Sequence, residues 1–309
     1  MKPDTGPGDD PAASVPGSGS GLSARRLDAV EPAHLKVPGD TSHAMYRYAP
    51  PPGFEGFLER FWIPVWSVPP GEQVPQKVLQ YPVCLIVITA GYARFYGVAS
   101  GLSTTTLTGD GWAVGVMLAP AAGHLLVGGA ASGGGAAGGD VAAGSVADYT
   151  DRFVDVPEIL GDAGRVLADR VRAAMAPDPH SERGHHAAME AYVSQLRRFL
   201  PVDAEGETVN RLVRYVESGR DVLRVAQVCE AFELGERSLQ RLVHRRLGLT
   251  PKWLIQRRRL REAADLLRRG ETTATEVAAV LGYADQAHFI RDFSAVTGMT
   301  PGRFAAGHG

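Results

Sequence analysis

A sequence pattern that occurs twice near the C-terminus most constrains how this chain of 309 residues can fold. The first copy contains Leu239-Gln240-Arg241-Leu242 and ends in Gly248-Leu249-Thr250-Pro251. The second contains Phe289-Ile290-Arg291-Asp292-Phe293 and ends in Gly298-Met299-Thr300-Pro301. Arg241 and Arg291 are 50 residues apart, as are the two Gly-x-Thr-Pro segments. The repeat predicts that one supersecondary unit, a helix with an arginine on its surface followed by a stop, is built twice.

Each copy predicts two short helices joined by a tight turn. In the first copy the second helix, about 236–247, is expected to bury its leucines and Val243 and to expose Arg237, Gln240, Arg241 and His244. In the second copy a helix from Asp285 to about Thr297 is expected to bury Phe289 and Phe293, with Ala287, Ile290 and Arg291 outward. This arrangement is typical of a helix-turn-helix.

The exposed residue types suit the reading of DNA. Arginine can bond O6 and N7 of guanine together, and glutamine can bond N6 and N7 of adenine. Neighbouring polar residues on the same helices are candidates for phosphate contacts, which fix the register of the protein on DNA. These phosphate candidates are Ser238, His244, Arg245, Gln286 and His288. The alternative is that these are only the solvated faces of ordinary helices.

The segment between the copies is predicted to be one long helix, 252–269. Its eighteen residues would span about 27 Å, against about 34 Å between successive major-groove faces of DNA. Such a helix could place two recognition helices on one face of a duplex. Four of its arginines, at 257, 258, 259 and 261, either contact phosphate or serve solubility, and we expect solvation or internal ion pairs for at least two of them.

Charge is distributed unevenly along the chain. Residues 207–306 carry 17 Lys and Arg against 12 Asp and Glu, whereas the rest carries 15 against 22. The asymmetry is consistent with one half that meets a polyanion, although chance is the alternative. The two cysteines, Cys84 and Cys229, have no partner at metal-ligand spacing and indicate a reducing setting. The charge-free run that follows Asp110 is broken by Pro120 and many glycines, so a membrane-spanning helix is not expected.

Composition divides the chain into four expected parts. They are a disordered N-terminal tail over 1–42, a β-rich sensor domain over 43–156, a helical linker or dimerisation segment over 157–204, and a DNA-binding domain over 205–306. Within the last part, the two helix-turn-helix units are expected at about 222–247 and 274–297, with the joining helix at about 251–269. The expected fold is therefore α+β and multidomain, with a small, cupin-like β-barrel or sandwich before an all-α domain.

The repeated region resembles the DNA-binding domain of the AraC/XylS family. The resemblance rests on Arg237-Ser238-Leu239-Gln240-Arg241-Leu242, on Leu281-Gly282-Tyr283, on Asp285-Gln286-x-His288-Phe289-x-Arg291-x-Phe293, and on both Gly-x-Thr-Pro segments. It implies a seven-helix domain of a transcription regulator. It assigns base reading to Arg237, Gln240, Arg241, Ala287, Ile290 and Arg291. The chain departs from the family at Glu233, where a turn glycine is usual, at Gly235, where a capping serine is usual, and at Ala287, where serine is common. Arg291 is thus the one strong reading side chain of the second copy, and we expect the first copy to carry more base discrimination.

The N-terminal part resembles an uncharacterised β-rich domain that precedes some DNA-binding domains of this family. The matching segments are Phe61-Trp62, Gln80-Tyr81-Pro82, Val116-x-Leu118-x-Pro120 and Asp148-Tyr149-x-Asp151-Arg152. In the wider family such a domain often binds an effector or dimerises. Five aromatic residues of this part could line a ligand pocket, but we interpret them as core residues; they are Tyr81, Trp62, Trp66, Tyr96 and Trp112.

The sequence therefore predicts a sequence-specific DNA-binding transcription regulator, without enzymatic activity, cofactor or metal, in the bacterial cytoplasm and associated with the nucleoid. Double-stranded DNA is the expected partner, with RNA polymerase, a small-molecule effector and a second copy of the chain as further options, and no membrane. Two alternatives stay open. One is a DNA-repair type of enzyme with a reactive cysteine, and the other is an interaction protein that binds DNA without sequence preference.

Overall fold

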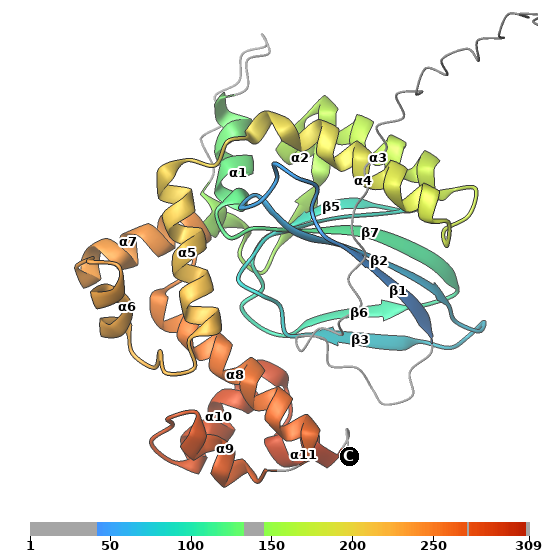
Figure 1. Ribbon diagram of the computed structural model, residues 1–309. Helices are drawn as coiled ribbons and strands as arrows, with labels where there is room; N and C mark the ends of the chain where they lie inside the picture. Colours follow the sequence, from blue (N-terminus) through green and yellow to red (C-terminus); the bar gives the residue numbers. More distant parts are fainter. Residues whose placement is uncertain (1–41, 133–144, 271, 307–309) are drawn as a thin grey trace, which may run out of the picture.

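The computed structural model describes residues 42–132, 145–270 and 272–306. All but the last residue of the expected disordered tail lies outside these ranges. Strands dominate the first part of the chain, helices the second, and a pair of helices joins them (Figure 1). The α+β, multidomain organisation expected from the sequence is confirmed.

The N-terminal part is organised around a six-stranded antiparallel sheet in the order β1-β2-β7-β4-β5-β8. Its strands are β1 (His43–Tyr48), β2 (Leu58–Ser67), β4 (Leu85–Thr89), β5 (Ala93–Tyr96), β7 (Asp110–Leu118) and β8 (Phe153–Asp155). A separate two-stranded sheet pairs β3 (Val74–Val78) with β6 (Ser103–Leu107). The two sheets lie face to face without closing into a barrel in the described part of the chain (Figure 1), so the structure has the sandwich form of the prediction.

Alternation along β2 explains why the large sheet has two different faces. Phe61, Ile63 and Val65 are buried, whereas Trp62 and Trp66 are half-buried on the opposite face. The helices α3 (Asp162–Met175) and α4 (Glu182–Leu196) form an antiparallel pair over one face of the sheet (Figure 1), and the Phe61 ring contacts that of Tyr192 on α4. Trp62 and Trp66 instead line a cavity together with residues of β3 and β6. The contact with α4 includes a hydrogen bond of 2.8 Å from the Tyr192 hydroxyl to the carbonyl of Val114.

The helices α3 and α4 thus pack on the β-domain, which is one of the two options that their apolar stripes left open. Short elements complete this part of the fold: α1 (Ala122–Ser132), the 3₁₀ turn η1 (Val146–Tyr149), α2 (Val156–Leu160) and the 3₁₀ turn η2 (Arg197–Phe199). Within the described ranges, no helix combines the length and the apolar character that crossing a membrane requires.

The described residues of the C-terminal part form seven helices, as the resemblance implied. They are α5 (Ala204–Ser218), α6 (Val225–Ala231), α7 (Glu236–Leu247), α8 (Pro251–Arg269), α9 (Ala274–Val280), α10 (Gln286–Thr297) and α11 (Pro301–Ala306). Two separate apolar cores hold these helices. The core of the N-terminal domain continues through α5 and α7 to Leu254 and Ile255. A second core, starting at Leu260, contains α9, α10 and α11 and takes in Leu79 from the N-terminal domain.

Candidate nucleic-acid interface

The first repeated unit is a helix, a tight turn and a second helix with a polar outer face. Glu233 adopts a φ of 52°, and the amide of Leu234 donates to the carbonyl of Cys229 at 2.9 Å, which closes the turn. Helix α7 then buries its apolar side chains, as expected, in the core shared with the N-terminal domain. Arg237, Gln240 and Arg241 are exposed on its other face. The Gln240 amide donates to Glu236 at 3.0 Å on the same surface.

The second unit repeats this geometry with a different set of outer side chains. Gly282, at a φ of 68°, stands in this turn where the first unit has Glu233. The amide of Tyr283 donates to the carbonyl of Ala278 at 2.9 Å. Asp285 caps α10 by accepting from the His288 amide at 2.6 Å. Among the predicted base-reading positions of α10, Ala287 and Arg291 are exposed and Ile290 is half-buried.

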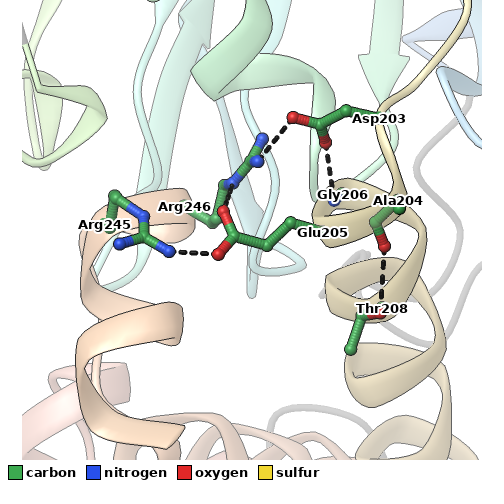
Figure 2. Close-up of polar contacts among 7 residues, drawn as sticks. All are labelled: Asp203, Ala204, Glu205, Gly206, Thr208, Arg245 and Arg246. Carbon is green, nitrogen blue, oxygen red and sulfur yellow. Dashed lines mark hydrogen bonds and ion pairs between the residues drawn. The ribbon is translucent and has the colours of Figure 1, made fainter. Parts of the chain in front are cut away.

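The five predicted phosphate candidates do not share one environment. Ser238, His244 and Gln286 are exposed. His288 lies against the ring of Tyr283, with 5.3 Å between ring centroids, and its Nε2 is 3.5 Å from an oxygen of Asp292. Arg245 is ion-paired with Glu205 of α5, so it already has an anionic partner within the chain (Figure 2).

Arg245 belongs to a cluster of four charged residues, which we call the α5–α7 clamp: Asp203, Glu205, Arg245 and Arg246. Arg246, whose side chain is only 5% exposed, donates from Nη2 to Asp203 at 2.6 Å and from Nε to Glu205 at 2.7 Å (Figure 2). Asp203 also caps α5, because its other oxygen accepts from the Gly206 amide at 2.7 Å. The clamp fixes the C-terminal end of α7 to the start of α5.

The electrostatics of the clamp follow from these contacts. The hydrogen bond from Arg246 lowers the pKa of the Asp203 carboxyl below its ordinary value. Burial, together with the nearby charge of Arg246, lowers the pKa of His124. The segment Asp203-x-Glu205 could have been recognised in the sequence as a capped helix start, but nothing in the sequence indicated which arginines it would meet.

Four arginines of α8, at 257, 258, 259 and 261, make internal contacts. Arg258 is ion-paired with Glu262 at 2.8 Å, and Arg261 is ion-paired with Glu217. Arg259 lies 3.8 Å from the centroid of the Tyr283 ring. Arg257 is 2% exposed and donates to two backbone carbonyls of the N-terminal domain. Solvation or internal ion pairs were expected for at least two of the four, and Arg258 and Arg261 have internal ion pairs. Phosphate contact does not fit the buried positions of Arg257, Arg258 and Arg261.

A second site candidate lies between the two sheets of the N-terminal domain. A cavity of about 180 Å³ is lined there by Trp62, Trp66 and Tyr96, which corrects our interpretation of these three residues as core. The reason is that the large sheet has two different faces, and the cavity lies between the face of Trp62 and Trp66 and the strands β3 and β6. Trp112 does belong to the core, and Tyr81 lies beneath the guanidinium of Arg261.

Features of an enzyme centre are scarce where the structure describes the chain. No group of three or more His, Cys, Asp or Glu is placed to hold a metal ion in the described ranges. Cys84 is buried, and burial raises the pKa of its thiol to about 12, which disfavours the reactive thiolate.

Comparison with known families matches the two parts of the chain separately. A model described as a helix-turn-helix domain matches residues 228–307, and one described as a domain of unknown function (DUF6597) matches residues 46–133. Both resemblances drawn from the sequence are thereby confirmed.

Curated proteins are similar to about a third of the chain. The HTH-type transcriptional activator RhaR of Cronobacter sakazakii is 31% identical over 98 residues, which are 31% of this chain and 35% of RhaR. The HTH-type transcriptional activator RhaS of Escherichia coli (strain SE11) is 35% identical over 82 residues, covering 26% of this chain and 30% of RhaS. The chain thus spans about a third of the length of the curated relatives it matches. Among solved structures, ToxT from Vibrio cholerae aligns over 86% of this chain and 98% of its own, at 13% identity and a TM-score of 0.38.

Proposed function

We propose, on the premise that the C-terminal domain belongs to the AraC/XylS type of helix-turn-helix domain, that this chain is a sequence-specific DNA-binding transcription regulator controlled through its N-terminal domain. The location that corresponds to this function is the bacterial cytoplasm, in contact with the nucleoid. The relatives RhaR and RhaS carry the description of transcriptional activators, and they match 31% and 26% of this chain.

The observation that carries the proposal is the repetition of an exposed recognition helix on one rigid connector. Helix α8 has 19 residues, which span about 28 Å. It starts at Pro251, three residues after the left-handed cap of α7 at Gly248, and its own left-handed cap is Gly270, shortly before α9. One protomer can therefore present α7 and α10 to neighbouring segments of a major groove about 34 Å apart.

The two recognition helices have unequal chemical capacity. Helix α7 exposes Arg237, Gln240 and Arg241, which can form paired hydrogen bonds with base edges. Of the three matched positions on α10, only Arg291 has this capacity, because Ala287 and Ile290 offer apolar contact alone. We infer that α7 supplies most of the base discrimination and that α10 contributes more through phosphate contacts and DNA shape.

Selection of bound duplexes from a random DNA pool, with the full chain, tests the proposal. The expected result is a preferred site with two elements about one helical turn apart. Arg241→Ala and Arg291→Ala should each weaken binding to that site by about 1–3 kcal/mol and relax base preference at one position. Arg165→Ala, which removes the same charge from exposed α3, is the matched control and should leave the base preference unchanged.

Two results would contradict the proposal in different ways. Equal binding to all sequences, with a steep salt dependence, would identify a non-specific DNA-binding protein. Rapid alkylation of Cys84 in the folded chain would favour the repair-type enzyme, whereas its burial predicts slow reaction. Unchanged affinity for the best site in both arginine variants would show that the base-reading roles are wrongly assigned.

A further inference from the structure

The cavity between the two sheets has an aromatic floor that the sheet is built to accommodate. Trp62 and Trp66 of β2 stand directly opposite Gly115 and Gly111 of β7 in the antiparallel register. A Cβ atom added at Gly115 would lie 2.2 Å from the Trp62 ring, and one added at Gly111 would lie 2.4 Å from the Trp66 ring. Each indole therefore covers the backbone of the neighbouring strand, at a position where any other residue would displace it. The two indoles are separated along β2 by Pro64, which also lines the cavity, and each offers a flat ring face for stacking.

The walls of the cavity are mainly apolar, with polar residues among them. Leu85, Val87 and Val78 line it, together with the polar residues His43, Gln76, Gln80, Tyr92, Ser103 and Thr105. Among the described residues that line it there is no Asp, Glu, Lys or Arg. A charged ligand would lose its hydration and find at most the imidazole of His43 as an ionic partner among these lining residues, which is costly. An apolar cavity of about 150 Å³ accepts benzene, so about 180 Å³ suits a molecule with one or two rings.

One short segment joins this cavity to the second half of the DNA-binding domain. The side chain of Gln80 lines the cavity, while its carbonyl accepts from Arg257 Nε of α8 at 3.1 Å. The neighbouring Leu79 is fully buried in the core that contains α9, α10 and α11. On the other side of Gln80, the ring of Tyr81 lies 4.0 Å from the guanidinium of Arg261.

Arg257 is held by the N-terminal domain through two neutral acceptors. Besides Gln80, it donates from Nη2 to the carbonyl of Gly101 at 2.8 Å. Its Nη1 is buried and has no hydrogen-bond partner among the described residues. A guanidinium bound only by carbonyls is held less strongly than one paired with a carboxylate. The contact can therefore yield when the backbone at Gln80 shifts.

We propose that the inter-sheet cavity binds an uncharged, planar aromatic molecule of one or two rings, and that segment 79–81 reports its occupancy to α8 through Arg257. This inference rests on the proposed function, since the signal it describes ends at the second recognition helix. Occupancy changes the backbone position of Gln80, and with it the placement of α8, α9 and α10 relative to the N-terminal domain.

The site is tested by titrating the full chain with 1-naphthol in the absence of DNA and measuring the binding by calorimetry. Saturable one-to-one binding is expected, with the anionic 1-naphthoate at least tenfold weaker. Trp62→Ala, which removes half of the floor, and Val87→Phe, which fills the cavity, should each weaken 1-naphthol at least tenfold. Val166→Ala, at an exposed position of α3, is the matched control and should bind as the native chain does. Unfolding curves establish which variants are folded. A single folded variant, either Trp62→Ala or Val87→Phe, is enough to test the site.

Hydrogen exchange with and without 1-naphthol tests the connection. Exchange at 79–81 and along α8 should change severalfold on binding in the native chain. In Arg257→Met, 1-naphthol affinity should stay within twofold while the response of α8 disappears. Changes confined to the cavity strands would overturn the connection, and absent or non-saturable binding, or tighter 1-naphthoate, would overturn the site. A chain that binds 1-naphthol but selects no DNA sequence would instead refute the proposed function, because the two measurements are independent.

Discussion

The two helix-turn-helix units share a local design but not a structural environment. Both recognition helices end at a glycine in the left-handed region, Gly248 at a φ of 71° and Gly298 at 73°. The first unit is built into the core of the N-terminal domain and is attached to α5 by the α5–α7 clamp. The second has a core of its own, into which the N-terminal domain extends Leu79.

This difference shows that a sequence repeat determines the fold of a unit but not its attachment. Arg246 of the clamp corresponds, 50 residues later, to the apolar Val296. Cores with many interlocked side chains transmit displacement, whereas a small contact allows relative motion. We therefore expect the first unit to behave as part of the N-terminal domain and the second as the adjustable one.

The largest effect is expected from replacing the two matched glycines. Gly248→Ala and Gly298→Ala each force a side chain into the left-handed region, at about 1–2 kcal/mol. At Gly248 the new Cβ would also lie 2.7 Å from the Cα of Ala147, whereas at Gly298 nothing lies within 4 Å. Gly248→Ala should therefore lower the free energy of unfolding by about 1–3 kcal/mol more than Gly298→Ala does. The measurement is the midpoint of urea unfolding, which should be lower in Gly248→Ala. Equal midpoints for the two variants would contradict the difference in environment.

A smaller effect is expected from Arg246→Leu. Asp203 and Glu205 are 49% and 38% exposed and can be rehydrated, so the cost should be about 1–2 kcal/mol rather than that of a fully buried pair. Hydrogen exchange should increase in α5 and α7 and stay unchanged in α9 and α10. The matched control is Arg245→Leu, at the preceding residue of the helix, where the side chain is more exposed. It should lower the free energy of unfolding by less than about 1 kcal/mol.

The same variant should also change the response to acid. Because Arg246 lowers the pKa of Asp203 in the folded chain, this carboxylate stabilises the fold above its unfolded pKa, and the contribution is lost as the pH falls through the folded pKa. Arg246→Leu should flatten that part of the acid titration of stability. A slope identical to that of the native chain would show that the clamp does not set the titration of Asp203.

The smallest effects concern the starts of the recognition helices, where the second unit has a side-chain cap and the first has none. Asp285→Ala removes the cap of α10 and should cost about 1 kcal/mol. Gly235, at the start of α7, provides no side-chain cap, and a Cβ there would meet nothing within 4 Å. Gly235→Ser should therefore stabilise the first unit by a few tenths of a kcal/mol, measured as a higher urea midpoint. A loss of stability in Gly235→Ser would mean that the backbone at this turn needs glycine.

Local signals in the sequence were sufficient for the helices of the C-terminal part. The apolar spacing in the second helix of each copy, the Gly-x-Thr-Pro stops and the cap at Asp285 all act within a few residues, and α7, α8 and α10 begin and end close to the expected positions. The outer faces of α7 and α10 follow from the same periodicity, because a buried stripe leaves the opposite side exposed. Whether these faces read DNA stays a prediction.

Long-range contacts decided what periodicity could not. The arginines of α8 look alike in sequence, yet Arg257 meets carbonyls about 156 and 177 residues away, and Arg261 meets Glu217. Trp62 and Trp66 could be core or pocket residues until the register placed glycines of β7 opposite them. The sequence by itself determined the repeated units and their outward chemistry, because those depend on neighbours along one helix. Only the tertiary structure decided which arginines are internal and where the cavity lies, because those depend on partners brought together by folding.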